Sequence, residues 1–493
     1  MYTALVPTDL PMDPVAITAR LQRACHPVLL HSGMQVGRYG DYSFAACDPF
    51  AVVTSKGGAV RLRWDDVYSE TMAEVVCRAG GAVSAAVEAG PRRGRLSRSA
   101  HLAADPFSVL DGLMGTWRSA PQQAPFPFTT GAIGYLGYDL GQHLEDLPRS
   151  TVDDIGGPDL YLGLYDAALA FCHCTGQVWA CGSDPGSRQQ ADARARHLVH
   201  LAACGTPVAR QPGPAGSGAL RCNFTRLEYI EALEHTIEYI YAGDIFQANL
   251  SQRFDTDLTV SPWELYRRLC AGNPAPFAAY LGFEDIAVVS ASPERFLLVA
   301  DGKIQTRPIK GTRPRGSTEK HDGALAAELL ASEKDAAELN MIVDLERNDL
   351  GRVCRFGSVK VPELVALESY PTVHHLVATV VGELAPGKSN IDLLRASFPG
   401  GSITGAPKIR AMEVIEELEP TWRGVYTGCI GYLGFDGAMD LNIAIRTVTC
   451  RNGKAYFQAG GGIVADSDPD MEYEETLHKA RALARALDVS LPD

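Results

Sequence analysis

The chain has 493 residues, a formal net charge of −14 and 46% hydrophobic residues. This length is ample for a large core, and the acidic balance argues against a nucleic acid or an anionic membrane as partner. No run approaches the ~18 apolar residues that a membrane span needs, and the first residues lack the basic and apolar regions of a signal peptide. The twelve cysteines show no disulfide-framework spacing, which favours a reduced, cytoplasmic protein.

The chain divides into two regions on composition. Residues 1–204 have the mixed pattern of an α+β region, with a short helix expected around Gln189–Leu201. Residues 205–222 begin with a nearly uncharged run rich in glycine and proline, so they are predicted to be a linker. Residues 223–487 contain the polar motifs considered below and are predicted to form the catalytic region.

The region after the linker predicts helices and short strands in irregular alternation. Thr225 and Glu228 have capping-box spacing, and apolar residues then repeat at helical spacing until the turn at 242–244. Another helix is expected from Ser332. Short strands are expected at 286–291, 296–300, 358–361 and 447–450. This order favours an α+β fold with largely antiparallel sheets over a βαβ repeat.

One segment occurs twice, far apart in the chain. Gly131–Asp139 (GAIGYLGYD) is echoed by Gly428–Asp436 (GCIGYLGFD), with glycines at the first, fourth and seventh positions. Glycines at this spacing in a strand indicate a close approach by another backbone. The separation is far too long for a solenoid repeat. We therefore expect two strands in similar places of one sheet system, with residues 1–204 packed on the same globule as the rest.

Cysteines and a histidine gather at Cys172-His173-Cys174, with Cys181 nearby. One interpretation is a partial metal site. However, Thr175-Gly176 is typical of a hairpin turn, and no second ligand pair follows at the usual spacing. We therefore favour a hairpin here over a metal site.

Lys310 is the most informative residue of the chain. It lies in Pro308–Gly316 (PIKGTRPRG), between a β-branched residue and a glycine, where backbone crowding is least. An amine placed there can approach a bound small molecule, and cationic or apolar surroundings would lower its pKa and make it a nucleophile at neutral pH. The alternative is a solvated loop lysine beside Arg313 and Arg315. A carboxylate, Glu294, precedes it in the motif SPERF.

Further carboxylates lie on predicted helices of the C-terminal half. Glu338 lies on the helix expected from Ser332, while Glu472, Glu475 and Lys479 share one face of a helix near the end of the chain. Two carboxylates from separate helices make an oxygen site suited to Mg²⁺, which keeps its other positions for water and substrate. Taken singly, each helix is more typical of an ordinary solvated face than of a metal site.

Two glycine-rich turns and one arginine complete the candidate groups. Exposed backbone N–H groups in the turns 400–408 (GGSITGAPK) and 459–464 (AGGGIV) can bind carboxylates or phosphates. The first turn ends in a lysine but lacks the P-loop spacing, which excludes a nucleotide-phosphate loop. Arg446 is expected inside an apolar strand, where an arginine usually needs a carboxylate partner.

Six motifs, in order, resemble the family of chorismate-utilising enzymes closely. They are Gly243–Leu250, Ser292–Phe296, Pro308–Gly316, Asp344–Gly351, Phe398–Lys408 and Glu472–Lys479. The resemblance covers residues 223–487 densely and the N-terminal region more loosely, through Leu29–Gly33 and Gly131–Asp139. It implies an α+β fold of large, mixed, mainly antiparallel sheets packed in a sandwich with helices outside, as in anthranilate synthase component I.

Two positions distinguish the reactions of this family. Members that aminate chorismate at C2 carry alanine where this chain has Lys310, and members that hydrate it carry a water-activating lysine where this chain has Gln247. The resemblance therefore implies amination of chorismate at C4 to 4-amino-4-deoxychorismate, through covalent attack of Lys310 on the ring. The alternatives are an anthranilate synthase component I and a chorismate-binding subunit without turnover.

The resemblance also implies roles for individual residues. Lys310 would be the nucleophile, Glu294 would protonate the leaving C4 hydroxyl, and His375 matches the family's active-site histidine. Residues that would bind the substrate are Ser402, Tyr426, Arg446, Gly460, Gly461, Gly462, Lys479 and Thr312.

The implied cofactor is Mg²⁺, held by Glu338 and Glu475 with Glu472 nearby through water. No Gly-x-Cys-x-Gly nucleophile motif with a His-x-Glu pair occurs in the sequence, so the ammonia is expected from a separate glutamine amidotransferase subunit. Some related proteins bind tryptophan in the N-terminal part, and here that site would fall on Ser32, Tyr39 and Tyr42.

Overall fold

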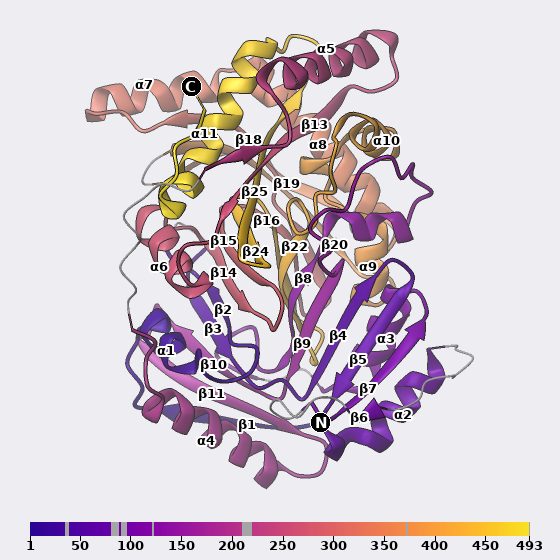
Figure 1. The fold of residues 1–493 in the computed structure, drawn as a ribbon, viewed down its shortest axis with the longest axis vertical. Coiled ribbons are helices and arrows are strands. Elements are labelled where there is room, and N and C mark those ends of the chain that lie inside the picture. Colours follow the sequence, from indigo (N-terminus) through magenta and orange to yellow (C-terminus); the bar gives the residue numbers. More distant parts are fainter. Residues whose placement is uncertain are drawn as a thin grey trace.

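Two large antiparallel sheets form the centre of the molecule. The computed structural model describes residues 1–34, 39–79, 88–89, 96–120, 123–209, 219–370 and 373–492. These residues include a twelve-stranded and a thirteen-stranded sheet whose neighbouring strands run antiparallel. Helices lie outside the sheets (Figure 1), which confirms the α+β sandwich expected from the sequence.

The twelve-stranded sheet takes strands from both halves of the chain. Its order is β1 (Tyr2–Thr8), β11 (Gln177–Asp184), β10 (Ala167–Cys172), β3 (Tyr42–Ala46), β2 (Val28–His31), β14 (Phe277–Gly282), β15 (Ala287–Ser292), β24 (Thr447–Arg451), β25 (Lys454–Ile463), β13 (Gln247–Asp257) and β12 (Arg221–Cys222), and β21 (Gly405–Ala406) also pairs with β13. The junction between the halves is the pairing of β2 with β14.

The thirteen-stranded sheet is mixed in the same way. Its order is β18 (Ile309–Pro314), β20 (Val373–Glu383), β17 (Lys303–Thr306), β16 (Arg295–Ala300), β23 (Met439–Ile443), β22 (Cys429–Gly434), β8 (Gly131–Leu136), β9 (Leu160–Tyr165), β4 (Ala51–Lys56), β5 (Ala59–Trp64), β7 (Arg98–Ala103) and β6 (Glu88–Ala89), and β19 (Lys360–Ser369) also pairs with β20. Here β8 and β22 join the two halves.

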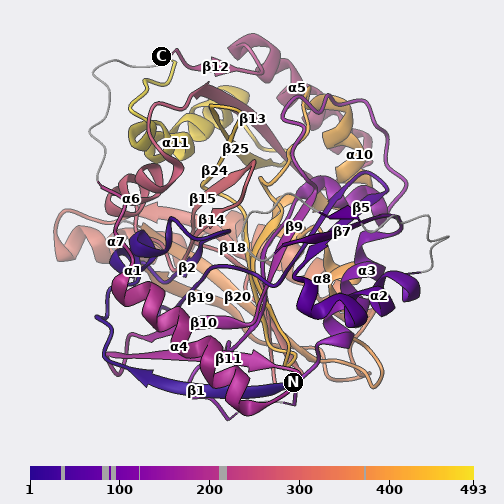
Figure 2. The same ribbon diagram turned by 60° about the horizontal axis from the view of Figure 1, so that its bottom comes forward.

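Eleven α-helices accompany the sheets in the described part of the chain. They are α1 (Pro14–Leu21), α2 (Ser69–Arg78), α3 (Pro106–Thr116), α4 (Arg188–Cys204), α5 (Arg226–Ala242), α6 (Pro262–Gly272), α7 (Glu319–Leu330), α8 (Glu333–Gly351), α9 (Asn390–Ser397), α10 (Lys408–Leu418) and α11 (Pro469–Leu487). Helix α4 lies against β1 and β11 (Figure 2). None of these helices is both long enough and apolar enough to cross a membrane.

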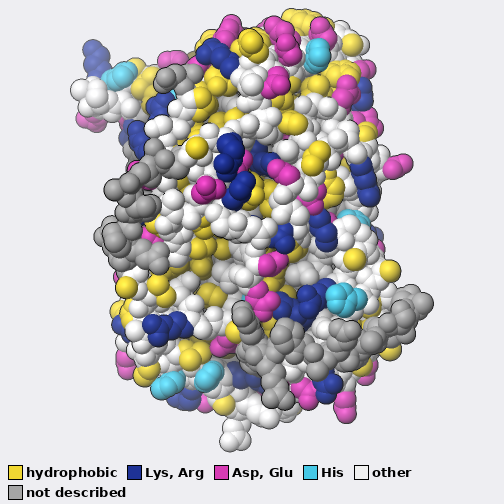
Figure 3. Space-filling model, viewed as in Figure 1, with side chains coloured by type: hydrophobic (Ala, Val, Ile, Leu, Met, Phe, Trp, Pro, Cys, Tyr) yellow, Lys and Arg dark blue, Asp and Glu magenta, His cyan; other side chains and the backbone are white. Residues whose placement is uncertain are grey.

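Three apolar layers hold the sandwich together. One lies between the sheets and includes Phe44 of β3, Ile133 of β8 and Ile430 of β22. The other two pack the outer face of each sheet against helices, for example Leu393 of α9 on one side and Leu483 of α11 on the other. Burial of these side chains is the main stabilising contribution, at roughly 25 cal/mol per Å² of apolar surface. On the face shown in Figure 3, acidic and basic side chains are interspersed.

The two similar glycine-rich segments, 131–139 and 428–436, form neighbouring strands, β8 and β22. In the pairing of β8 with β22, Gly134 lies opposite Gly431. A Cβ on Gly134 would lie 2.0 Å from the Tyr161 carbonyl oxygen, and one on Gly431 would lie 2.0 Å from the Asp440 carbonyl oxygen. The close backbone approach predicted from the glycines is therefore present.

Local predictions hold at several elements and fail at one residue. Helix α5 begins with the predicted capping box, in which Thr225 and Glu228 satisfy each other's backbone N–H groups, and Gly243 caps its C-terminus with φ 85°. Of the predicted linker, residues 210–218 lie outside the described residues, while Arg221–Cys222 already pair with β13. The prediction that Arg446 lies inside a strand is wrong, because it occupies a bend between β23 and β24 with φ 51°.

Candidate functional site

Lys310 lies on β18, the edge strand of the thirteen-stranded sheet, which packs against α8. The register of β18 with β20 shifts between Lys310 and Thr312, and Gly311 has φ 71° at the shift. Such a bulge re-aims the side chains around it, and the positive φ favours glycine. A Cβ on Gly311 would also lie 2.9 Å from the Asp335 side chain. The glycine after Lys310 is therefore required by both the backbone angle and the packing against α8.

The Lys310 ammonium lies between carboxylates of separate elements. It is half-buried, and Nζ donates to the Ser402 carbonyl oxygen at 3.3 Å. Burial lowers the pKa of Lys310 below its ordinary value, against the attraction of Glu338 and Glu294. The site therefore favours a neutral amine more than water does.

Glu294 lies in the turn between β15 and β16 and is only 6% exposed. The Ser402 hydroxyl donates to its Oε1 at 2.7 Å. Burial raises the pKa of Glu294, although this hydrogen bond and the Lys310 charge oppose the shift. A single residue, Ser402, thus contacts the predicted nucleophile through its carbonyl oxygen and the predicted acid through its hydroxyl.

Three further carboxylates lie on α8 and α11, of which Glu338 and Glu475 act on Lys310 electrostatically and Glu472 acts with Glu475 and Lys479. Burial raises the pKa of Glu338 and of Glu472, and the negative charge of Glu475 contributes to both shifts. Glu475, whose side chain is 53% exposed, has a lowered pKa, because the charges of Lys479 and Lys310 outweigh its partial desolvation. The Lys479 ammonium lies 2.5 Å from Glu475 Oε1. The structure therefore brings these acids into one electrostatic neighbourhood.

Strand β25 contributes three consecutive glycines, Gly460–Gly462, next to Lys310, Glu472 and Lys479. The Lys479 ammonium donates to the Gly460 carbonyl oxygen at 2.9 Å. A Cβ on Gly461 would lie 2.9 Å from Glu472 Oε2, and one on Gly462 would lie 3.4 Å from Lys310 Nζ. Side chains at these positions would press on Glu472 at Gly461 and on Gln247 and Lys310 at Gly462, so glycine keeps the site open.

Arg446, Tyr426 and His375 border the same region. The Arg446 guanidinium donates to the Lys479 carbonyl oxygen, so its contact is a backbone oxygen rather than the expected carboxylate. Burial raises the pKa of Tyr426 to about 12 and lowers that of His375 to about 4. Neutral His375 makes a hydrogen bond with the exposed Thr312 hydroxyl, Nδ1 to Oγ1, at 2.9 Å.

The site holds more carboxylates than cationic side chains. Four carboxylates (Glu294, Glu338, Glu472, Glu475) face three cationic groups (Lys310, Arg446, Lys479). In the described residues, no three His, Cys, Asp or Glu side chains are close enough to form a complete metal site. Two mutually repelling carboxylates nevertheless fit a dication that is completed by substrate and water.

Residues 78–485 match the family of chorismate binding enzymes. The match spans most of the chain and all six motifs. The chain belongs to the chorismate binding enzyme family. The family expected from the sequence is therefore confirmed, and the protein is an enzyme.

Three curated relatives of this chorismate binding enzyme carry two different names. Aminodeoxychorismate synthase component 1 of Bacillus subtilis is 39% identical over 468 residues, covering 94% of this chain and 92% of the relative. The protein of the same name from Salmonella typhimurium is 47% identical over 385 residues, covering 78% and 83%. Anthranilate synthase component 1 of Thermus thermophilus is 46% identical over 368 residues, covering 74% and 79%.

A solved structure shows the same architecture. Anthranilate synthase component I from Streptococcus pneumoniae matches with a TM-score of 0.75 and 31% identity, over 92% of this chain and 94% of that chain. The sandwich and its helices are therefore those of this enzyme family.

The structure shows contacts around three residues of the chorismate binding enzyme site to which the sequence assigns no catalytic or binding role. Gln247 is fully buried beside Gly462 and Lys310, and neither polar atom of its side chain has a hydrogen-bond partner among the described residues. The Lys408 ammonium lies 2.5 Å from Asp349 Oδ2, which ties the loop bearing Ser402 to α8. These residues stand inside the six motifs, but only the structure reveals their burial and contacts.

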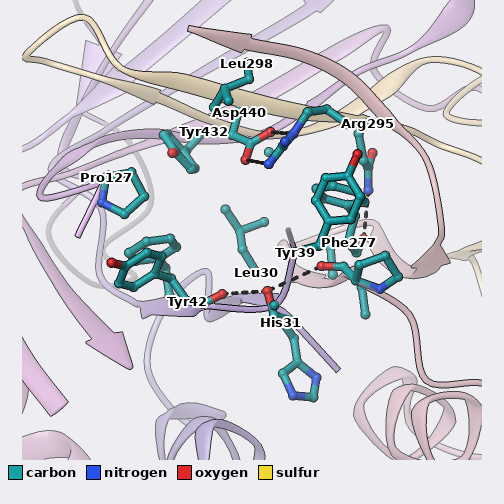
Figure 4. A pocket seen from close by; sticks show the side chains of 18 of the residues that line it. Leu30, His31, Tyr39, Tyr42, Pro127, Phe277, Arg295, Leu298, Tyr432 and Asp440 are labelled. Atoms are coloured by element: carbon teal, nitrogen blue, oxygen red, sulfur yellow. Dashed lines mark hydrogen bonds and ion pairs between the residues drawn. The ribbon is translucent and has the colours of Figure 1, made fainter. Parts of the chain in front are cut away.

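The residues expected for tryptophan binding line a separate cavity of about 350 Å³. The Ser32 hydroxyl donates to the Tyr42 carbonyl oxygen at 2.7 Å, and Tyr39 lies edge-on to Phe277 with 5.2 Å between ring centroids. Figure 4 shows Tyr42 on one side of this space and Arg295, joined to Asp440, on another. The structure thus brings Ser32, Tyr39 and Tyr42 together around one cavity.

Proposed function

We propose that the enzyme aminates chorismate at C4 and forms 4-amino-4-deoxychorismate. The observation that carries the proposal is the placement of Lys310, whose amine is half-buried between Glu294 and Glu338 and contacts Ser402. The relatives named aminodeoxychorismate synthase component 1 support the same reaction. An ordinary solvated lysine would have neither the lowered pKa nor the carboxylate neighbours.

The proposed reaction has two displacement steps. The neutral Lys310 amine bonds to ring carbon C2 as the C4–oxygen bond breaks, and Glu294 gives its proton to the departing hydroxyl, which leaves as water. General acid assistance of this kind contributes typically ~10² to 10⁴ in rate. Ammonia then bonds to C4 and the bond from C2 to Lys310 breaks, so chorismate and ammonia give product and water.

The other site residues are proposed to bind the two carboxylates of the substrate. Glu338 and Glu475 would hold Mg²⁺, with Glu472 nearby, and the ion would supply the positive charge that attracts the ring carboxylate. Arg446, Tyr426 and the Gly460–Gly462 backbone would hold the enolpyruvyl carboxylate. His375 and Thr312 would orient the ring through their mutual hydrogen bond.

Ammonia is proposed to come from a separate glutamine amidotransferase subunit. The name "component 1" of the relatives supports a second component, and the sequence holds no glutaminase motif. We also propose that the enzyme acts in the cytoplasm, since all twelve cysteines are free thiols.

The decisive experiment is product analysis. The purified enzyme is incubated with chorismate, Mg²⁺ and ammonium, and the products are separated by mass. The proposal expects 4-amino-4-deoxychorismate without pyruvate. Anthranilate with equimolar pyruvate would identify the enzyme as a C2-aminating synthase instead, and no turnover would favour a binding subunit.

We further propose that the cavity lined by Ser32, Tyr39 and Tyr42 binds tryptophan. Its aromatic walls and the guanidinium of Arg295 suit a ligand with an aromatic ring and a polar end. Calorimetric titration with L-tryptophan tests this, with Tyr39→Ala as the variant. Equal affinity in the two proteins, or none in the parent, would refute the assignment.

A further inference from the structure

The hairpin turn between β10 and β11 brings two thiols into contact. Cys172 ends β10, and Cys174 lies in the turn, with 3.1 Å between the two sulfur atoms. A disulfide bond is about 2.05 Å long, so the sulfurs are about 1 Å from bonding distance. Cys174 is exposed to solvent, whereas Cys172 is 4% exposed.

The turn is fixed on three sides. Cys172 is in register with Gln177 of β11 and with Tyr42 of β3, and the Gly176 N–H donates to the Cys172 carbonyl oxygen at 2.9 Å. His173 between the cysteines makes a hydrogen bond from Nε2 to the Ser43 hydroxyl at 2.8 Å. The sulfur–sulfur contact is therefore set by the sheet rather than by a free loop.

The surroundings of Cys172 stabilise its thiolate. Burial opposes ionisation, but hydrogen bonds from the Thr175 side chain, from Cys174 and from the backbone N–H groups of Cys174 and Thr175 outweigh it. The pKa of Cys172 is therefore below its ordinary value. The pKa of Cys174 is raised by its contact with Cys172. Cys181, the third cysteine of this group, is fully buried, and its pKa is raised by burial.

We propose that Cys172 and Cys174 form a reversible dithiol–disulfide site that reacts with low-molecular-weight disulfides. Exposed Cys174 passes its proton to the Cys172 thiolate that it contacts and attacks the external disulfide. This forms a mixed disulfide on Cys174 and releases one thiolate, which takes the proton from Cys172 and leaves as a thiol. Cys172 thiolate then attacks the Cys174 sulfur, closes the internal disulfide and expels the second thiol. Two protein thiols are oxidised and one external disulfide is reduced to two thiols, so electrons and protons balance.

The geometry favours this chemistry over a metal site. The structure describes no group of three His, Cys, Asp or Glu side chains able to hold a metal ion, and His173 is already bonded to Ser43. Thiol–disulfide exchange needs a thiol that solvent can reach and a neighbouring thiol that ionises readily, and Cys174 and Cys172 meet these two needs.

The test uses the full-length reduced protein and oxidised glutathione as the probe. After incubation, free thiols are alkylated and the cysteine peptides are identified by mass. The matched control within the same chain is Cys204, an exposed cysteine whose sulfur lies 3.6 Å from His200 Nδ1 rather than beside a second thiol. The proposal expects Cys204 to retain glutathione while Cys172 and Cys174 become linked and lose it.

Two variants separate the steps. Cys172→Ser should leave glutathione bound to Cys174, because the thiol that expels it is gone. Thr175→Val, which removes one donor to the thiolate, should slow closure of the internal disulfide. The inference is overturned if Cys174 of the parent protein keeps glutathione to the same extent as Cys204, or if neither Cys172 nor Cys174 reacts while Cys204 does.

Discussion

Replacing Lys408 by methionine tests the attachment of the Ser402 loop to α8. Lys408 begins α10, and its ammonium donates to Asp349 Oδ2 at 2.5 Å and to the Ser397 carbonyl oxygen at 2.8 Å. The side chains of Lys408 and Asp349 are 12% and 4% exposed. Methionine keeps most of the side-chain volume but leaves the Asp349 carboxylate buried without its cation. Breaking a buried pair in this way typically costs about 3–5 kcal/mol.

The loss of unfolding free energy in Lys408→Met should depend on pH. Burial already raises the pKa of Asp349, and Lys408 is the main opposing charge. Without Lys408 the folded-state pKa rises further above the unfolded value, so the carboxylate destabilises the fold at neutral and alkaline pH. Protonation relieves that penalty as the pH falls. The loss should therefore be largest above neutrality and shrink toward pH 5.

The assay is urea unfolding of the parent, Lys408→Met, Asp349→Asn and the double variant. The neutral Asn–Met pair should be more stable than Lys408→Met alone, with a coupling of about 1–3 kcal/mol. Turnover should fall in Lys408→Met, because Ser402 contacts both Glu294 and Lys310. A change below about 0.5 kcal/mol in Lys408→Met, which is the range of neutral surface substitutions, would refute the reasoning.

Further predictions concern the chemistry of the site. Lys310→Ala should lose C4 amination by more than roughly 10²-fold, as measured by product formation, and an unchanged rate would exclude the lysine as nucleophile. Glu294→Gln should lower kcat/KM by ~10² to 10⁴, and its residual rate should rise steadily with pH as the Lys310 amine loses its proton; a bell-shaped profile in this variant would contradict the assigned acid. Glu338→Gln should weaken Mg²⁺ binding in calorimetric titration, whereas unaltered affinity would place the ion elsewhere. Gly462→Ala should reduce turnover with little loss of stability if Gln247, 1.9 Å from the new Cβ, is displaced toward Lys310; full activity would show that the site adapts.

Much of the fold could be predicted because local signals agreed with the tertiary structure. The capping box at Thr225 and Glu228 and the hairpin at Thr175-Gly176 depend on neighbouring residues, so sequence spacing suffices to find them. Strand order could not be predicted in this way. The pairing of β2 with β14 depends on contacts between residues far apart in the chain, which no short pattern encodes.

The candidate site shows the same division. The motifs identified Lys310, Glu294 and the acids of α8 and α11, because each stands in a distinctive residue pattern. The burial of Gln247 and the pairing of Lys408 with Asp349 required the structure. Apolar residues flank Arg446 and predict a strand there, but no local pattern indicates the bend at φ 51°.

The pairing of β8 with β22 bears on how the protein is made. Strand β8 is complete at Leu136, yet its neighbour in the sheet, β22, begins only at Cys429. During synthesis, the edge of β8 that pairs with β22 therefore has no partner strand until most of the polypeptide has left the ribosome. An unpaired strand edge is prone to association with other chains. Severing the gene between residues 204 and 223 would give two fragments that each lack half of a shared sheet, and neither should fold without the other.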